Sequence, residues 1–247
     1  MKIAIAQTRP IKGAVSANIE AHKNFIGLAL TLKADAIFFP ELSLTGYEPE
    51  LANELATSQN DSRLDTFQNI SDKDKIIIGL GLPTRTESKI RISMIIFEPN
   101  RPRRTYSKQQ LHSDELPHFE NGVEQVVITT DEVRIVPAIC YESLQPTHFE
   151  NAFKLGVDIY LASVAKSEKG IENALKYFPI MARQYAIPVL MSNSVGFCDN
   201  FLSAGKSAVW TKDGKLAGQL DEKTEGMLIF DMETEDILER TLAPSGE

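Results

Sequence analysis

The sequence contains only two cysteines, Cys140 and Cys198, among 247 residues. Two cysteines in a chain of this length do not make a disulfide scaffold. We therefore expect both thiols to be free, in a reducing cytoplasm. No apolar run approaches the length that spans a bilayer. The N-terminus lacks the long apolar region and small-residue cleavage site of a signal peptide, so we expect neither a membrane partner nor secretion.

Basic residues are also scarce: 26 Lys and Arg stand against 34 Asp and Glu, for a net charge of -8. Because nucleic-acid phosphates demand Lys and Arg, this balance argues against a nucleic-acid partner. We expect the one dense basic patch, "RPRR" (101–104), to be an exposed hairpin turn. The four histidines show neither His-x-His nor His-Glu-x-x-His spacing, so we do not expect a zinc site.

The sequence has no linker rich in Pro, Gly or Ser, no low-complexity run and no clear repeat, which predicts a single domain over residues 1–247. Short buried runs alternate with helical stretches, and hairpin-like strands intervene. This pattern predicts an α/β layered protein with mixed sheets. The expected strands are 2–8, 34–42, 75–83, 89–99, 132–140, 157–165, 187–196, 206–215 and 226–232, and the expected helices are 16–34, 146–156 and 171–186.

Two local signals refine this pattern. Pro179 lies inside the expected helix 171–186, so it should kink that helix or begin a new segment. "TKDGK" (211–215) predicts a hairpin turn, because Asp-Gly supplies the positive φ angles that such turns need.

Three expected strands end at chemically useful side chains. Glu41 follows the run "AIFFP", Lys108 follows "RRTYS", and Cys140 ends "IVPAIC". Ligands of α/β proteins gather at strand ends. A thiol attacks only after losing its proton, a carboxylate can accept that proton, and an ammonium can stabilise the thiolate and a later oxyanion. Taken singly, each residue has a plainer explanation: Cys140 as inert packing, Glu41 as a helix cap, and Lys108 as a solvated charge.

Taken together, the segments resemble the nitrilase superfamily, or carbon-nitrogen hydrolases, over nearly the whole chain. "ADAIFFPELSLTGY", "YSKQQLHSDELPHFENG" and "ICYESLQP" are similar to its three motifs, in the right order. The resemblance implies that Glu41 is the general base, Lys108 the catalytic lysine and Cys140 the nucleophile. It also implies a four-layer α-β-β-α sandwich with two mixed sheets, and a homodimer or higher homo-oligomer that joins through helices.

The implied reaction is hydrolysis of a small amide or carbamoyl compound through a cysteine thioester, with no metal or organic cofactor. Lys108 and the backbone N–H of Tyr141 would hold the oxyanion. The family has a second glutamate after the lysine, and Glu115 is the best match, with Asp114 and Glu120 as neighbouring candidates.

The cysteine motif departs from the common family pattern, because Glu142 replaces an Asp, Leu144 an Arg and Gln145 an aromatic residue. These changes put a substrate contact or a local salt bridge in doubt, but not the chemistry of the thiol. The expected substrate-binding residues are Tyr47, Phe119, Glu142 and Lys166. Lys166 is a candidate to bind a substrate carboxylate, and the alternative is a solvated loop charge.

Two other functions and one other catalytic arrangement stay open at this point. The same Glu-Lys-Cys site would also hydrolyse nitriles, although true nitrilases tend to be longer chains. A non-catalytic binding protein with a relic site would keep the fold without the activity. A Cys140–His148 dyad is the third possibility, but we expect His148 on the surface of its helix. Cys198 is expected to be a structural or loop thiol.

Overall fold

The computed structural model describes residues 1–87, 89–130 and 133–242. The larger of its two main sheets has seven strands in the order β15-β14-β1-β2-β3-β4-β5. β1 to β3 run parallel, and the outer pairs are antiparallel. The strands are β1 (Lys2–Gln7), β2 (Ala36–Phe38), β3 (Ile77–Arg85), β4 (Ile90–Phe97), β5 (Arg104–Ser107), β14 (Gly226–Asp231) and β15 (Ile237–Thr241).

The second main sheet has six strands in the order β13-β12-β9-β8-β7-β6, and it is also mixed because only β7, β8 and β9 run parallel. The strands are β6 (Ile128–Thr129), β7 (Arg134–Ile139), β8 (Ile159–Val164), β9 (Val189–Asn193), β12 (Ala208–Trp210) and β13 (Leu216–Gln219). A separate hairpin pairs β10 (Val195–Cys198) with β11 (Phe201–Ala204). The predicted "TKDGK" turn joins the antiparallel strands β12 and β13 and contains Gly214 at φ 75°.

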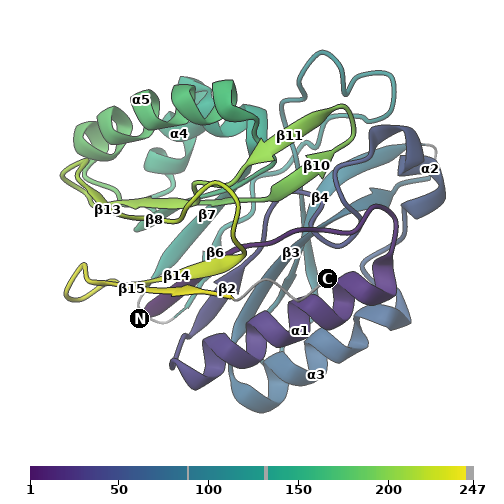
Figure 1. Ribbon diagram of the computed structural model, residues 1–247, viewed down its shortest axis with the longest axis horizontal. Coiled ribbons are helices and arrows are strands. Elements are labelled where there is room, and N and C mark those ends of the chain that lie inside the picture. The colour runs from purple at the N-terminus through teal and green to yellow at the C-terminus, as the bar shows by residue number, and fades with distance from the viewer. Residues whose placement is uncertain (88, 131–132, 243–247) are drawn as a thin grey trace.

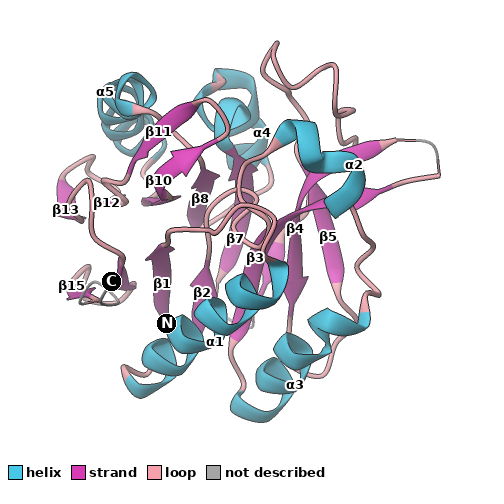
Figure 2. Cartoon of the chain, turned by 45° about the vertical axis from the view of Figure 1, so that its right-hand side comes forward, coloured by secondary structure: helices cyan, strands magenta, loops and turns pink. Residues whose placement is uncertain are grey.

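The helices lie on the outer faces of the two sheets, so the fold has four layers, as predicted (Figure 1; Figure 2). α1 and α3 cover the seven-stranded sheet, while α4 and α5 cover the six-stranded sheet. The helices are α1 (Val15–Thr31), α2 (Ala52–Leu55), α3 (Asp65–Asp74), α4 (Pro146–Lys154) and α5 (Glu168–Tyr185), with 3-10 helices η1 (Pro49–Leu51), η2 (Ser62–Leu64) and η3 (Cys140–Leu144).

Strand alternation explains this layering. In β1, Ile3 and Ile5 point into the core shared by the two sheets, whereas Ala4 and Ala6 point to the core beneath α1. Successive side chains of a strand face opposite sides of a sheet, so one short strand serves two cores. The small alanines let the helix approach the sheet closely.

Pro179 lies within α5, which runs unbroken from Glu168 to Tyr185. The expectation that Pro179 begins a new segment is therefore wrong. A proline inside a helix removes one backbone hydrogen bond. Here the helix continues because Ile171, Phe178 and Met181 bury its inner face against the six-stranded sheet.

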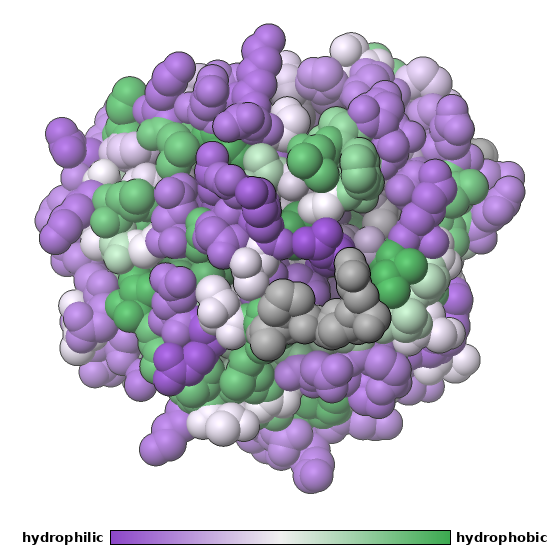
Figure 3. All heavy atoms as spheres, viewed as in Figure 1, coloured by the Kyte–Doolittle hydropathy of each residue, from purple (hydrophilic) through white to green (hydrophobic). Residues whose placement is uncertain are grey.

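Most of the surface in view is hydrophilic, and hydrophobic side chains form small separate groups on it (Figure 3). The most exposed large apolar residue of the described chain is Phe197, on the β10–β11 hairpin, at 84% exposure. Within the described residues, none of the helices is long and apolar enough to cross a membrane.

Candidate active site

Lys108 and Cys140 lie directly after β5 and β7, and Glu41 lies three residues after the end of β2. β2 and β5 belong to the seven-stranded sheet and β7 to the six-stranded sheet. Lys108 and Glu41, from one sheet, meet through a hydrogen bond between their side chains, and Cys140, from the other sheet, lies close enough to Glu41 to affect its pKa. The strand ends singled out in the sequence converge on one place.

Two glycines make the placement of Glu41 and Lys108 possible. A Cβ atom on Gly81 would lie 2.4 Å from the backbone nitrogen of Leu42, so only glycine lets β3 approach the turn that carries Glu41. Gly122 donates its N–H to the carbonyl of Lys108 over 2.6 Å, and a Cβ there would lie 2.2 Å from the carbonyl oxygen of Ser107. Both catalytic candidates therefore stand on backbone that is tightly held.

The Lys108 ammonium is fully buried between two carboxylates. Its Nζ lies 2.7 Å from Oε1 of Glu41 and 2.6 Å from Oε1 of Glu115. Burial acts to lower the pKa of Lys108, but Glu41 and Glu115 outweigh it and hold this pKa above its ordinary value. Lys108 is thus a permanent ammonium, fixed by charge-assisted hydrogen bonds.

Of the three acids that follow Lys108, Glu115 reaches it. Its Oε1 also accepts a hydrogen bond from the hydroxyl of Tyr47 over 2.9 Å, and its Oε2 accepts one from the backbone N–H of His112. Asp114 is an exposed acid paired with His112, and Glu120 pairs with Arg91. Of these three candidates, only Glu115 therefore forms an ion pair with Lys108.

Glu41 is a carboxyl group in a fully buried position. Burial raises its pKa to about 7, although the Lys108 ammonium opposes the rise. Its Oε1 accepts from Lys108, whereas its Oε2 is buried without a well-aligned hydrogen-bond donor among the described residues. The Cys140 thiol lies close enough to lower the Glu41 pKa. One oxygen of Glu41 is thus free to accept a proton.

Cys140 occupies the sharp turn between β7 and η3, with φ at 48°. A residue other than glycine in this left-handed region costs of order 1–3 kcal/mol, and such strain gathers at functional sites. The Ser143 hydroxyl donates to the carbonyl of Cys140 over 2.6 Å, which holds the turn. Burial, followed by the charge of Glu41, raises the pKa of the thiol to about 11, although Lys166 and Lys108 oppose this rise. The resting thiol is protonated.

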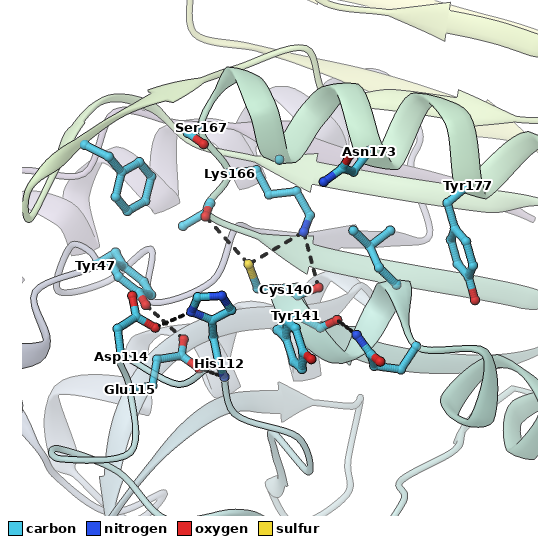
Figure 4. A pocket seen from close by; sticks show the side chains of 15 residues that line it. Tyr47, His112, Asp114, Glu115, Cys140, Tyr141, Lys166, Ser167, Asn173 and Tyr177 are labelled. Carbon is cyan, nitrogen blue, oxygen red and sulfur yellow. Dashed lines mark hydrogen bonds and ion pairs between the residues drawn. The ribbon is translucent and has the colours of Figure 1, made fainter.

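The thiol faces a cavity of about 520 Å³ (Figure 4). Tyr47 and Lys166, two of the residues expected to bind substrate, line it, and so does Leu144, which stands where the resemblance places an arginine. The cavity is lined by Tyr47, His112, Asp114, Glu115, Cys140, Tyr141, Leu144, Gln145, Ala165, Lys166, Ser167, Gly170, Asn173, Tyr177 and Phe201. Its wall combines aromatic faces with few charges, which is typical of a small-molecule site.

Two of the residues expected to bind substrate lie elsewhere. Glu142 has no exposed surface, and its two oxygens accept hydrogen bonds from Ile139 N–H and Gln109 N–H. Phe119 is 7% exposed and packs in the core between the sheets. The expectation that Glu142 and Phe119 contact the substrate is therefore wrong. η3 directs the side chain of Glu142 inward and not toward the cavity, and the side chain of Phe119 is part of the core.

His148 is also placed differently from the expectation. It is 2% exposed, and its two ring nitrogens lie 3.0 Å from the Tyr106 hydroxyl and 2.8 Å from the Tyr160 hydroxyl. The surface position expected for it is wrong, because α4 presents this face to the sheet. Burial lowers the pKa of His148 to about 4, so the ring is neutral. Its ring nitrogens are engaged with tyrosines, which leaves the Cys–His dyad without support.

Cys198 is a buried free thiol whose sulfur lies 3.6 Å from the Ser194 hydroxyl. Sequence reasoning missed Phe201, which lines the cavity from β11, and Asn193, which ends β9. Asn193 follows the same strand-end rule that found Cys140, so a signal for it was present. Across the described residues, no cluster of three or more His, Cys, Asp and Glu is arranged to hold a metal ion.

Comparison with known proteins assigns the sequence to a protein family. The model of the carbon-nitrogen hydrolase family matches residues 2–240. A probable nitrilase of Schizosaccharomyces pombe is 23% identical over 248 residues, with 95% of this chain and 89% of the relative covered. A glutamine-dependent NAD(+) synthetase of Acinetobacter baylyi is 24% identical, and the chain spans 99% of its own length but only 46% of that relative.

Solved structures share the fold. An amidase from Nesterenkonia sp. AN1, with the acetamide moiety of fluoroacetamide on its active-site cysteine, superposes with a TM-score of 0.85 at 20% identity, covering 93% of this chain and 89% of that one. A variant of that amidase in complex with butyramide gives a TM-score of 0.85 over the same shares of both chains. These likenesses establish the α-β-β-α architecture.

Proposed function

The chain belongs to the carbon-nitrogen hydrolase family, and we propose that it hydrolyses the carbon–nitrogen bond of a small amide or carbamoyl compound through a thioester on Cys140. The observation that carries this proposal is the buried ammonium of Lys108, held between Glu41 and Glu115 beside a cysteine that faces a cavity. A nucleophile, a base and a fixed positive charge at one point are the parts that acyl transfer needs.

In the first step, Glu41 removes the proton of Cys140 as the sulfur attacks the carbonyl carbon. The free Oε2 of Glu41 is the acceptor. With the pKa of Glu41 at about 7 and that of Cys140 at about 11, the resting pair is carboxylate and thiol. A general base works best with a pKa near the operating pH, which Glu41 satisfies.

The new S–C bond turns the carbonyl oxygen into an oxyanion. Lys108 and the backbone N–H of Tyr141 stabilise it, since both are in place before the reaction begins. Glu115 and Tyr47 hold Lys108 in position through their shared hydrogen bonds. The ammonium cannot drift during the reaction, because both of its carboxylate partners are buried.

Collapse of the tetrahedral intermediate breaks the C–N bond. Glu41 passes its proton to the departing nitrogen, and ammonia or an amine leaves. Water then adds to the thioester with Glu41 as base, the S–C bond breaks, and the acid is released while the thiol regains its proton. The sum is one amide and one water converted to one acid and one ammonia or amine, with no redox change.

Short amides are the first substrates to try, because variants of one amidase of the same fold are seen in complex with butyramide and acrylamide. Nitrile hydrolysis by the same residues is the runner-up reaction, and the similarity to a probable nitrilase supports its inclusion. A relic site without catalysis is the alternative from another class. It predicts an ordinary alkylation rate at Cys140.

The experiment compares the wild type with Cys140→Ala on a panel of neutral amides, ω-amides, carbamoyl compounds and nitriles. Cys198→Ala serves as the matched control, since it removes the other thiol, which lies outside the cavity lining. We expect turnover in the wild type and the control, none in Cys140→Ala, and an acyl adduct on Cys140 by intact mass. Full activity of Cys140→Ala overturns the proposal.

We also propose that the chain forms a homodimer through its outer helices. Phe153 on α4 and Ile180 on α5 are 49% and 62% exposed, and both lie in the helical layer that covers the six-stranded sheet. Burying such residues is favourable by about 25 cal/mol per Å² of apolar surface. Light scattering of the wild type and of Ile180→Glu tests this: a wild-type monomer at micromolar concentration contradicts it.

A further inference from the structure

Lys166 places a second ammonium beside the nucleophile. It follows β8, is 6% exposed and lines the cavity. Its Nζ lies 3.8 Å from Sγ of Cys140 and 3.4 Å from the carbonyl oxygen of the same residue (Figure 4). The mechanism above does not use this group, so its presence calls for a separate explanation.

The backbone of Lys166 is held as firmly as that of the catalytic candidates. The Asn193 side chain accepts from Lys166 N–H over 2.9 Å and donates to the Lys166 carbonyl over 3.3 Å. Ala204 N–H donates to the same carbonyl over 2.9 Å. The first turn of α5 packs on the side chain at Gly170, where a Cβ would lie 3.1 Å from Cβ of Lys166. Lys166 is thus built into the site.

The ammonium of Lys166 has no carboxylate partner among the described residues. The two acids of the cavity are engaged elsewhere, Glu115 with Lys108 and Asp114 with His112. Its described contacts are the carbonyl and the sulfur of Cys140, and the carbonyl is 3.4 Å away. Because a nearly buried charge without a partner is costly, such a group is suited to receive an anion from the cavity.

We propose that Lys166 binds a carboxylate of the substrate, so that the preferred substrates are short amides that carry a carboxylate. This inference rests on the proposed hydrolase function and deepens it. The scissile carbon comes within about 3.5 Å of the sulfur before attack, and a carboxylate oxygen lies about 2.8 Å from an ammonium. With Nζ 3.8 Å from Sγ, the site fits roughly one to three carbons between amide and carboxylate.

The competing role is stabilisation of the thiolate alone. Lys166 does lower the pKa of Cys140, against the larger effect of burial, which raises it. That role would act on every substrate alike, because the thiolate forms whatever the acyl group is. Selectivity between charged and neutral substrates therefore separates the two roles, whereas loss of total activity does not.

The test compares kcat/KM for succinamate with kcat/KM for butyramide, which has a similar chain and no carboxylate, in the wild type and in Lys166→Met. We expect the wild type to prefer succinamate and Lys166→Met to lose about 10- to 100-fold of that preference, the effect of one charge-assisted hydrogen bond. An equal loss on both substrates assigns Lys166 to the thiolate and overturns the inference, as does an unchanged ratio.

Lys169→Met is the matched control, since Lys169 is an exposed lysine in the first turn of α5, three residues after Lys166. It should keep the wild-type ratio. Lys166→Arg should retain part of the preference, because a guanidinium also binds carboxylates. Thermal unfolding of each variant confirms that the comparison is made between folded proteins.

A binding measurement separates failure of this inference from failure of the hydrolase proposal. Calorimetry of Cys140→Ala with succinamate needs no turnover, and we expect binding that Cys140→Ala/Lys166→Met weakens by about 10-fold or more. Lysine-dependent binding without hydrolysis in the wild type refutes the hydrolase alone. Hydrolysis of butyramide with no lysine-dependent preference or binding refutes the carboxylate site alone.

Discussion

The carboxylate of Glu142 accepts a hydrogen bond from the backbone N–H of Gln109 over 2.5 Å. Glu142 lies two residues after the candidate nucleophile, and Gln109 directly follows Lys108. One fully buried side chain thus ties the turn of the cysteine to the segment of the lysine. The same carboxylate also accepts from Ile139 N–H over 2.7 Å and from the Tyr106 hydroxyl over 2.6 Å.

Glu142→Ala should therefore lower both stability and kcat. It leaves several buried donors without an acceptor, and each unsatisfied buried donor costs about 1–3 kcal/mol. We expect that decrease in the free energy of unfolding by urea titration, with kcat falling more than KM rises. Glu142→Gln keeps one acceptor oxygen and should recover part of the lost stability and part of the lost kcat.

The control is Glu150→Ala, at an exposed position of α4, which should change the free energy of unfolding by less than about 0.5 kcal/mol. A stable Glu142→Ala with normal kcat contradicts the positioning role.

The pH dependence of kcat/KM should report Glu41. Burial raises the pKa of this group to about 7, and the base works only when ionised. We expect kcat/KM to rise about tenfold per pH unit below 7 and to level off above it. A profile with a neutral amide substrate measures this without titration of a substrate carboxylate. An acid limb near the ordinary value of 4.5 would show that Glu41 is not the base or is not buried as described.

Lys108→Met should abolish hydrolysis and destabilise the fold in a pH-dependent way. The ammonium lowers the pKa of Glu41 against the effect of burial, so its removal raises that pKa further. The folded variant then retains a proton that the unfolded chain loses above pH 4.5, and its stability falls as pH rises beyond that value. We expect a loss of about 3–5 kcal/mol at pH 8 and a smaller loss at pH 5.

Urea titrations of Lys108→Met at these two pH values check the sign. The control is Lys23→Met, which breaks an exposed i,i+3 pair with Glu20 and should cost less than about 1 kcal/mol at either pH. Equal destabilisation of Lys108→Met at pH 5 and pH 8 would mean that its cost is packing rather than charge.

The local pattern of hydrophobic residues predicted most of the strand ends that carry the candidate site. Glu41 and Cys140 each follow an apolar run that could be found in the sequence, whereas Lys108 follows the mostly polar stretch "RRTYS", and the sheets bring these ends together. The layers were predictable for the same reason, since alternation in β1 assigns Ile3 and Ala4 to different cores. The carboxylates and the ammonium recognised in the motifs also lie within hydrogen-bond distance of one another.

The directions in which individual side chains point were less predictable from the sequence. Glu142 and His148 turn inward because they pair with Gln109, Tyr106 and Tyr160, and no local pattern shows such long-range partners. Phe201 reaches the cavity from a hairpin 61 residues after Cys140, so its role depends on how β11 packs. Sequence patterns place backbone elements, whereas the packing of distant elements decides which way a polar side chain points.

Gly170→Ala separates the position of Lys166 from its charge. A Cβ at residue 170 would lie 3.1 Å from Cβ and 3.3 Å from Cγ of Lys166, so the lysine side chain must shift. Alanine favours the helix by about 1 kcal/mol over glycine, which offsets the crowding. We expect the free energy of unfolding to change little and the preference for succinamate over butyramide to fall, although every charge is kept.

The control is Gly27→Ala, in α1, where no atom lies within 4 Å of the added Cβ. This variant should gain stability and keep the wild-type preference. An unchanged preference in Gly170→Ala would show that the ammonium adapts to the shift and that its charge, not its placement over Cys140, determines the selectivity.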